Sequence, residues 1–513
     1  MPIPVESMLI TRRAMGHFAP LLTTGFAVAF LLLIATVEAA ALTDVTGGPM
    51  GMVAAPVLNS VHSRKTHGAL PVPLDLPLSL SACAPPTGAG TLHGSLVPGD
   101  HWTVAGNPHI ITFDVTLASG TLTLDPCVVV RVREGFNIRI GNNPGGSPAS
   151  LVAVGAPSLP IIFESEDPTK YWGSLRIIAT GSANLESVTL RHAGNAATAQ
   201  SFGGALQVLG DGIGTALTRN ARVKNVRIET SATFGLNIQS SGGLTADSSG
   251  LVIFDSGRTP GNLAIDTSYP VFVNPPSINT LPSGTYTGNA KDAILVGDQG
   301  VVAADERFRN LGVPYRMRFG YTQLPALPSL QGGLSILEID AGVTIKFLNT
   351  VGNTWSLNLG AYGGQPADVS PVRLIANGTL AQPIYLTSAA AAPAAGDWGG
   401  IEWHGGPDTG NVMNFVHVEF AGADSSTSGY GCGPVDNDAA LIITNWVPGA
   451  DFVQNSTFSN SAAGGIVLGW SSNSVHDFKT NNTFTAIGNG CAVARWQDPP
   501  PGPNCPLPRP ICF

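Results

Sequence analysis

Charged side chains are scarce in this chain of 513 residues. Asp, Glu, Lys and Arg together make up 12% of it, about half the share found in ordinary globular proteins. A surface made of long amphipathic helices needs more charge than this, so a mainly helical surface is excluded. The net charge is −9, and no basic stripe is present that could hold phosphates, so nucleic acid is excluded as a partner.

Helical periodicity and familiar catalytic signatures are also missing. No segment of the body carries apolar residues at a helical period over a length that could cover a sheet. The chain has no His-Glu-x-x-His zinc helix, no phosphate-binding loop, no nucleophile elbow and no tandem calcium repeat. The sequence therefore gives no direct evidence for any of these enzyme classes.

Short strands and turns are abundant instead. The chain contains 62 Gly and 40 Pro, and brief β-branched runs recur between turns rich in Gly, Asn and Ser. Within these runs the residues alternate. In the segment 415–422, Val416 and Val418 are expected to face one side of a strand and His417 and Glu419 the other.

An internal duplication is the strongest pattern in the chain. Trp172-Gly173 recurs as Trp398-Gly399, an offset of 398 − 172 = 226. The other matched segments are Gly106–His109 with Gly312–Tyr315, Leu122–Val132 with Leu337–Phe347, Pro160–Ser165 with Pro383–Ser388, and Leu185–Gly194 with Met413–Gly422. The offset grows from 312 − 106 = 206 to 422 − 194 = 228, as loop insertions produce in a duplicated structural unit.

Strands that recur every ~20–25 residues without intervening helices predict a coil that stacks on itself. Each turn of such a coil buries its apolar face against the turns above and below. Asn-containing turns at Asn225, Asn455 and 481–482 suit the stack, because Asn tolerates left-handed backbone and its amides can form ladders between rungs. Trp172 and Trp398, shared by both halves, are expected in the interior. The alternative architecture is a pair of β-sandwiches, one for each repeat.

Three segments resemble those of bacterial right-handed parallel β-helix proteins of the pectate-lyase-like superfamily, in its exported and mostly uncharacterised branch. They are Leu337–Phe347 (LEIDAGVTIKF), 396–401 (GDWGGI) and 415–422 (FVHVEFAG). The resemblance covers roughly residues 100–495, and it implies an all-β, right-handed parallel β-helix built from two homologous halves. It implies much less about activity, because function must come from a site and not from a fold. The closely spaced Asp residues and partnered Arg of pectate lyases are not recognisable here.

The N-terminus reads as an export signal. Arg12 and Arg13 precede an uncharged run over 18–37, which ends in the small residues of 39–41. Residues 1–41 are therefore a signal peptide, or an uncleaved membrane anchor, because the run is just long enough to span a bilayer. A twin-arginine signal is a weaker reading of the same residues. Each reading places the body outside the cytoplasm, either secreted or at the cell surface.

The six cysteines fit an exported chain, in which an even number favours disulfides over metal binding. Cys505 could pair with Cys512, and Cys432 with Cys491, but the sequence cannot decide the connectivity. The residues before Cys83 also match a lipoprotein cleavage box, which leaves lipidation of that cysteine as an alternative.

Composition divides the rest of the chain. Residues 42–100 read as a Pro/Gly-rich linker, 101–260 as the first half of the β-helix, 261–307 as inter-repeat coils, 308–496 as the second half, and 497–513 as a Pro-rich tail that contains cysteine. We expect the protein to be a monomer.

Outward positions that have diverged between the halves point to a candidate site in the second half. Arg176 corresponds to Glu402, and Arg191 corresponds to Glu419. If Ile401 lies over Val416 in the coil, Glu402 would stack on His417 and His404 on Glu419, and each carboxylate–imidazole pair could act as a general acid/base. The alternative is a solvated strand face without a function.

The loop 423–439 and nearby aromatic residues could contribute to the same site. Asp436 and Asp438 could bind calcium through oxygen ligands, and Asp424 could contact a substrate. Tyr430, Trp446 and Trp470 fall in or beside turns, where an exposed ring could stack on a sugar. Apart from this calcium, the sequence indicates no cofactor.

Two functions follow as hypotheses. The first is an exported or surface-attached β-helix without catalytic activity, which binds environmental polysaccharide or a cell-envelope glycan. The alternative is a lyase or glycoside hydrolase acting on an acidic polysaccharide, with its machinery around Glu402, His404, His417 and Glu419.

Overall fold

The structure is a computed structural model, and the chain divides into two units, Met1–Leu74 and Asp75–Phe513. Only the second contains residues that the structure describes. These are residues 82–197, 202–211, 217–259, 265–297, 301–302, 305–318, 321–323, 334–347, 356–360, 372–404, 409–423, 438–444, 448, 450–469, 476–495 and 511–512. The predicted signal or anchor at 1–41 therefore lies outside the described residues. Within them, no helix is both long enough and apolar enough to cross a membrane.

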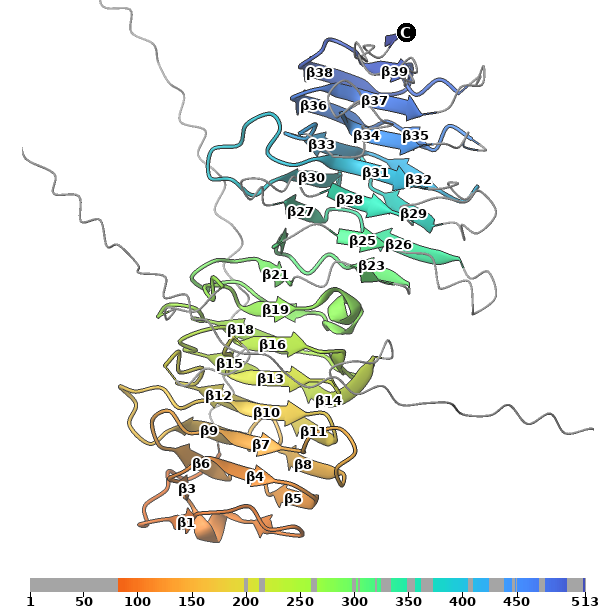
Figure 1. Ribbon diagram of the computed structural model, residues 1–513. Coiled ribbons are helices and arrows are strands. Elements are labelled where there is room, and N and C mark those ends of the chain that lie inside the picture. Colours follow the sequence, from red (N-terminus) through yellow and green to blue (C-terminus); the bar gives the residue numbers. More distant parts are fainter. Residues whose placement is uncertain are drawn as a thin grey trace, which may run out of the picture. The chain divides into compact units, whose positions relative to one another are not determined.

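One long sheet runs through the described part of this unit (Figure 1). We call it the long sheet, and its thirteen strands pair in chain order. They are β4 (Val115–Leu117), β7 (Ile138–Ile140), β10 (Leu175–Ile178), β13 (Leu206–Leu209), β16 (Leu236–Gln239), β19 (Val271–Val273), β21 (Ile294–Val296), β24 (Tyr315–Met317), β27 (Thr344–Phe347), β30 (Ile384–Ser388), β33 (Val416–Glu419), β36 (Thr457–Ser461) and β38 (Thr483–Ile487).

Two further sheets accompany the long sheet in the first half. The N-terminal eight-stranded sheet contains β1 (Thr91–His93), β3 (His109–Ile111), β6 (Val129–Val132), β9 (Ile161–Ser165), β12 (Val188–Arg191), β15 (Arg227–Glu229), β18 (Leu251–Phe254) and β20 (Gly284–Thr285). The six-stranded sheet contains β2 (His101–Trp102), β5 (Gly120–Leu124), β8 (Ala149–Val154), β11 (Gly181–Glu186), β14 (Thr218–Lys224) and β17 (Gly242–Leu244).

Two different sheets accompany it in the second half. The C-terminal eight-stranded sheet contains β22 (Val301–Val302), β25 (Tyr321–Gln323), β28 (Ser356–Leu359), β31 (Gly400–His404), β34 (Ala439–Thr444), β37 (Gly464–Gly469), β39 (Val493–Arg495) and β40 (Ile511–Cys512). The five-stranded sheet contains β23 (Glu306–Phe308), β26 (Ser335–Ile339), β29 (Val372–Asn377), β32 (Val412–Asn414) and β35 (Val453–Gln454). Two short 3₁₀ helices, η1 (Val104–Gly106) and η2 (Pro275–Thr280), interrupt the strands.

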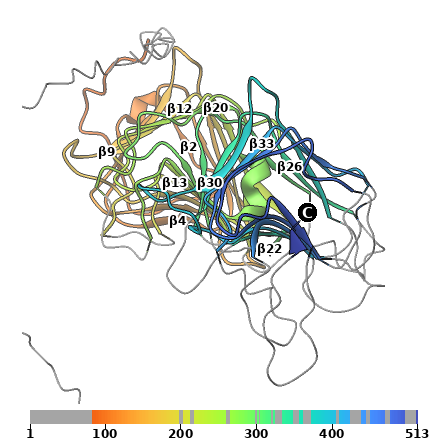
Figure 2. The same ribbon diagram turned by 90° about the horizontal axis from the view of Figure 1, so that it is seen from above.

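The fold is a parallel β-helix. Consecutive strands of the chain lie in different sheets, and each strand pairs in parallel with strands of the rungs before and after it, as β8 does with β5 and β11. Figure 2 looks down on the same stack of rungs. The predicted all-β solenoid is thus confirmed, and the β-sandwich alternative is wrong, because sandwich strands pair mainly antiparallel with their neighbours.

Alternation along the strands creates the core, as the sequence predicted. In β8, Ala149, Leu151 and Ala153 are buried while the residues between them are partly exposed. The inward residues of successive rungs join into one apolar cluster that extends from Leu96 to Val493. Each rung is therefore stabilised mainly by burial against its neighbours, at about 25 cal/mol for each Å² of apolar surface.

The duplication is visible at a corner that both halves repeat. The indole Nε1 of Trp172 donates to the carbonyl oxygen of Arg191 at 2.9 Å, and that of Trp398 donates to the carbonyl oxygen of Glu419 at 2.8 Å. The corresponding glycines, Gly194 and Gly422, have φ of 74° and 82°. Both indoles are fully buried, as predicted. The matched segments thus fold into the same local structure.

The two halves nevertheless differ in phase. In the first half the successive strands β5, β6 and β7 belong to the six-stranded, the N-terminal eight-stranded and the long sheet. Their sequence counterparts β26, β27 and β28 belong to the five-stranded, the long and the C-terminal eight-stranded sheet. Strands that correspond in sequence therefore lie in different sheets in the two halves, shifted by one position around the coil. A strand of the N-terminal eight-stranded sheet thus corresponds to a strand of the long sheet.

The predicted Asn turns and amide ladder are both present. Asn225 and Asn455 have φ of 52° and 50°, in the left-handed region that Asn tolerates. The side-chain Nδ2 of Asn455 donates to Oδ1 of Asn414 at 2.9 Å, and Nδ2 of Asn414 donates to Oδ1 of Asn377 at 3.2 Å. These bonds tie three successive rungs together at one corner.

The disulfides correct both suggested pairings. Cys83 is bonded to Cys127, with their Cα atoms 5.3 Å apart, and Cys491 is bonded to Cys512, with their Cα atoms 5.2 Å apart. Cys432 and Cys505 lie outside the described residues. The sulfur of Cys83 is already used, so lipidation of this cysteine is excluded as well. Disulfides favour an oxidising, extracytoplasmic environment.

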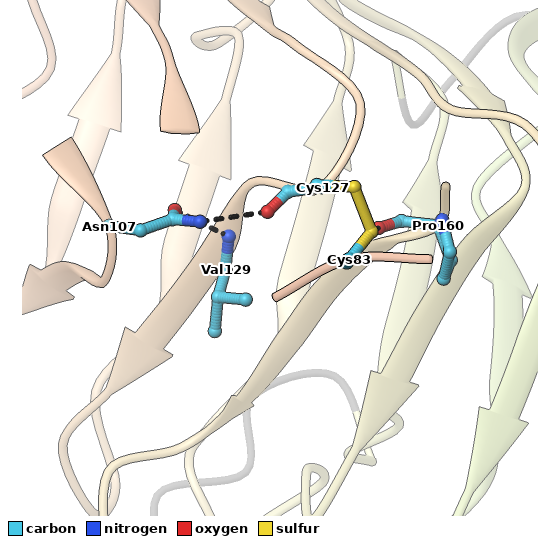
Figure 3. The surroundings of a disulfide bond; sticks show 5 residues. All are labelled: Cys83, Asn107, Cys127, Val129 and Pro160. Atoms are coloured by element: carbon cyan, nitrogen blue, oxygen red, sulfur yellow. Dashed lines mark hydrogen bonds between the residues drawn. A yellow bond between two sulfur atoms is a disulfide. The ribbon is translucent and has the colours of Figure 1, made fainter. Parts of the chain in front are cut away.

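The Cys83 disulfide also shows that the folded body begins earlier in the chain than predicted (Figure 3). Asn107 supports Cys127, because its Nδ2 donates to the carbonyl oxygen of Cys127 at 2.8 Å while its Oδ1 accepts from the backbone N–H of Val129 at 2.9 Å. Strand β1 pairs with β3. Residues from 82 onward thus belong to the solenoid, and the predicted linker boundary at residue 100 is wrong by at least one strand.

Candidate functional site

The predicted stacking of Glu402 on His417 does not occur. Glu402 lies on β31 in the C-terminal eight-stranded sheet, where it is opposite Asn358 and Ile442. His417 lies on β33 in the long sheet, opposite Tyr385 and Thr457. Strands adjacent in the chain turn a corner into the next sheet, so the register that places Ile401 over Val416 is wrong. Glu402 is also buried, and because β31 and β33 lie in different sheets, neither proposed pair is formed by strand register.

The remaining predicted site residues divide into two groups. His404 is the last residue of β31, and Asp438 is buried immediately before β34. Asp424, Tyr430, Asp436, Trp446 and Trp470 lie outside the described residues. Within the described ranges, no group of three or more His, Cys, Asp and Glu side chains could hold a metal ion. Calcium binding by Asp436 and Asp438 stays a prediction.

His417 and Glu419 belong to a more extensive feature on the outer face of the long sheet. In the first half, an outward row of this sheet is accessible at Thr116 on β4 and Arg139 on β7, but it is covered from β10 to β21. Arg176, Gln207 and Asn237 face each other in register on β10, β13 and β16, and all three are buried. Phe272 and Leu295 continue this row and pack into a separate apolar cluster. This part of the face is therefore closed to a ligand.

In the second half the same outer face is open. Two parallel rows of side chains run across five consecutive strands, and we call them together the outer ladder. One row contains Thr344, Tyr385, His417, Thr457 and Thr483, and the other contains Lys346, Thr387, Glu419, Ser459 and Thr485. These side chains are partly exposed on the first four strands and exposed on β38. Most of them carry a hydroxyl group, and successive rungs repeat at about 4.8 Å.

Contacts within the outer ladder hold its centre in place. The rings of Tyr385 and His417 stack with centroids 4.7 Å apart and an interplanar angle of 15°. On the neighbouring row, Oγ1 of Thr387 donates to Oε2 of Glu419 at 3.0 Å. One face of each ring is thus already occupied. Recognition by the pair would rely on hydrogen bonds from the Tyr hydroxyl and the imidazole nitrogens rather than on flat stacking of a sugar ring.

The interior beneath the outer ladder is rigid and aromatic. Phe347 stacks on Trp398 with centroids 4.2 Å apart, and Phe458 stacks on Phe484 at 5.3 Å. The indole of Trp398 donates to the carbonyl oxygen of Glu419, as described above. These contacts fix the backbone of β33 and β36, so the outward side chains are held in register without a ligand.

In the first half, the side chains that correspond in sequence to one row of the outer ladder bind each other. Arg131, Glu164 and Arg191 occupy the positions of Lys346, Thr387 and Glu419. Glu164 accepts hydrogen bonds from Arg131 at 2.9 Å and from Arg191 at 2.5 Å. Although its burial acts in the opposite direction, the bonds and charges of the two arginines keep the pKa of Glu164 below its ordinary value. That row is satisfied internally by ion pairs.

The outer ladder has few such internal partners, and its donors and acceptors face solvent. A row of regularly spaced hydroxyl, imidazole and carboxylate groups is suited to a polymer that presents hydroxyl groups at regular intervals. Sequence reasoning identified His417 and Glu419 but missed Tyr385, Thr387 and Thr457. The sequence does contain this signal, because Thr457-Phe-Ser459 and Thr483-Phe-Thr485 each place two outward hydroxyl groups on either side of a ring that packs against the core.

Comparison with protein-family models, curated proteins and solved structures finds no match to this chain. The assignment of a function therefore depends on the outer ladder and on the fold that positions it.

Proposed function

We propose that this protein is an exported, non-catalytic β-helix of the pectate-lyase-like type, and that its outer ladder binds an extended polysaccharide. The observation that carries the proposal is the exposure of this one stretch of the long sheet. Its outward rows are at least partly exposed over five strands in register, whereas the corresponding row is buried on β10, β13, β16, β19 and β21.

The chemistry of the outer ladder favours a weak but repeated interaction. Each hydrogen bond between a neutral side chain and a sugar hydroxyl contributes about 1 kcal/mol after desolvation. Several rungs acting on one chain add their contributions, because contacts after the first are made at a high effective concentration. A polymer is therefore expected to bind much more tightly than its monomer. Export fits the N-terminal segment and the two disulfides.

The first prediction is that shortening three ladder side chains weakens polysaccharide binding. The variant carries Thr387→Ala, His417→Ala and Thr457→Ala, and we expect at least a tenfold loss of affinity, equivalent to about 1.4 kcal/mol. Binding of the full chain is measured by affinity electrophoresis in gels that contain neutral or acidic polysaccharides. The matched control carries Thr116→Ala, Thr121→Ala and Thr123→Ala, which remove three hydroxyls from the first two rungs.

Two results would contradict the proposal. The first is equal retardation of both triple variants and the wild type by every polysaccharide tested. The second is release of new reducing ends or unsaturated products from a bound polysaccharide, because this would make the protein an enzyme. Melting temperatures of all three proteins show whether each variant is folded.

A further inference from the structure

A separate cleft lies where the sheets of the two halves meet. The six-stranded sheet ends at β17, the five-stranded sheet begins at β23, and the two strands do not pair. Helix η2 contacts both strands and fills part of the gap. The cleft has a volume of about 460 Å³ and is lined from β14, the turn after β17, η2, β23 and β26. This volume lies within the usual range for small-molecule sites, about 300–1,000 Å³.

Glu306 is the unusual residue of this cleft. It is the first residue of β23, and the alternation of the strand turns it inward together with Phe308. Its side chain is 3% exposed, and Oε2 is buried without a hydrogen-bond partner among the described residues. A buried polar atom without a partner costs about 1–3 kcal/mol. The structure thus maintains an unfavourable group at the wall of the cleft.

Burial raises the pKa of Glu306 well above its ordinary value, and the charge of Asp305 acts in the same direction. The other charged groups lining the cleft are Arg219 from β14, Arg307 and Arg309 from β23 and the residues after it, and Glu338 from β26. The lining residues include no histidine. A raised pKa extends the range over which Glu306 is a neutral acid that can donate a hydrogen bond.

The arginines differ in their existing partners. Nε of Arg307 donates to Oδ1 of Asp340 at 2.8 Å, and a guanidinium nitrogen of Arg309 donates to the carbonyl oxygen of Leu281 at 3.3 Å. Arg219 is exposed, and its side chain makes no hydrogen bond or ion pair with a described residue. Its planar guanidinium is therefore available for the two parallel hydrogen bonds that a carboxylate accepts.

We propose that this cleft binds a small hydroxylated carboxylate. Arg219 takes the carboxylate, the neutral acid of Glu306 donates a hydrogen bond to the ligand, and the carboxylates of Asp305 and Glu338 accept from its hydroxyl groups. The charges leave Arg219 for this ligand, because Arg307 is already paired with Asp340 and Glu338, whereas Arg219 has no ion pair with a described residue. The site is separate from the outer ladder and does not depend on polysaccharide binding.

The test is calorimetric titration of the full chain with three probes: D-gluconate, the neutral sugar D-glucose, and acetate, which lacks hydroxyl groups. We expect gluconate to bind most tightly and glucose to show no measurable binding. Arg219→Gln should weaken gluconate binding by about tenfold or more. The matched control is Arg133→Gln, which removes an exposed arginine directly after β6 and should leave the affinity unchanged.

The pH dependence identifies the role of Glu306. Gluconate affinity should fall as the pH rises through the raised pKa of this carboxyl, because the ionised form repels the ligand. Glu306→Gln keeps the shape and the donor, so it should bind gluconate with little pH dependence. Equal binding of gluconate and glucose, or no binding of gluconate, would overturn the proposal. So would calcium binding that Glu306→Gln abolishes, since this would make the cleft a cation site.

Discussion

Replacement of Trp398 by alanine is expected to lower the free energy of unfolding by about 3–5 kcal/mol. The indole is fully buried, stacks on Phe347 at 4.2 Å, and donates to the carbonyl oxygen of Glu419. Alanine would leave a cavity, and it would also remove the hydrogen bond that the indole donates to that carbonyl. The loss is measured by urea denaturation of the full chain, followed by circular dichroism in the β region.

Three further variants show whether the loss of stability comes from the packing of this indole or from substitution in general. Trp172→Ala in the first half should produce a similar loss, because the corner and its hydrogen bond are the same. Trp398→Phe should cost much less than alanine, because it keeps most of the stacking and loses mainly the hydrogen bond, worth about 1 kcal/mol. Leu380→Ala should have almost no effect, since this side chain is 84% exposed. A loss below about 1 kcal/mol for Trp398→Ala would show that this corner contributes little to the stability.

The architecture could be predicted because several patterns agree. Alternation in segments such as 415–422 identifies strands with one buried face, and the absence of helical patterns leaves these strands only each other to pack against. The duplication then predicts stacked units. The left-handed backbone conformation of Asn225 and Asn455 confirms the predicted Asn turns.

The neighbour relationships between strands could not be predicted from the same patterns. Alternation with a period of two residues predicts which side chains face outward, but it does not predict which strands pair with each other. In the structure the partner of a residue lies about one full turn away, as with His417 and Thr457. The prediction that paired Glu402 with His417 assumed pairing between strands that are adjacent in the chain. It failed because three strands and their corners complete each turn.

The phase change between the halves has the same physical origin. Equivalent strands such as β12 and β33 have nearly the same inward pattern, so both can form one wall of a coil. No local pattern in these strands encodes which wall they form. Under our proposal the phase change affects function. It places His417 and Glu419 on the open part of the long sheet, whereas Arg191 lies in an ion-paired row.

Glu306 shows how a site can be missed when a segment is read only as a connection. The composition of residues 261–307 places Glu306 in the inter-repeat coils and predicts no role for it. The alternation Glu306-Arg307-Phe308 does indicate that the acid shares the inward side with a buried ring. A charged residue at an inward position is costly unless it is paired, and this cost is a signal for function that could have been read from the sequence.

Removal of the Cys83–Cys127 disulfide is expected to destabilise mainly the N-terminal rungs. The bond joins residues that are 44 positions apart, and closing a loop of this length contributes about 4 kcal/mol in the chain-entropy model. In a solenoid each rung contacts only its neighbours, so the loss should not spread evenly. The double variant Cys83→Ser, Cys127→Ser should exchange amide hydrogens faster in β1, β3 and β6.

Hydrogen exchange with mass spectrometry gives the position of the effect. Peptides from β30, β33 and β36 should keep their wild-type protection, because at least eight strands of the long sheet separate them from β4. The matched variant is Cys491→Ser, Cys512→Ser, which should loosen β37 and β39 and leave β1 unchanged, since β40 pairs with β39 beside that bond. Uniform loss of protection after removal of either disulfide would mean that the described rungs unfold as one cooperative unit, and stability could then not be assigned rung by rung.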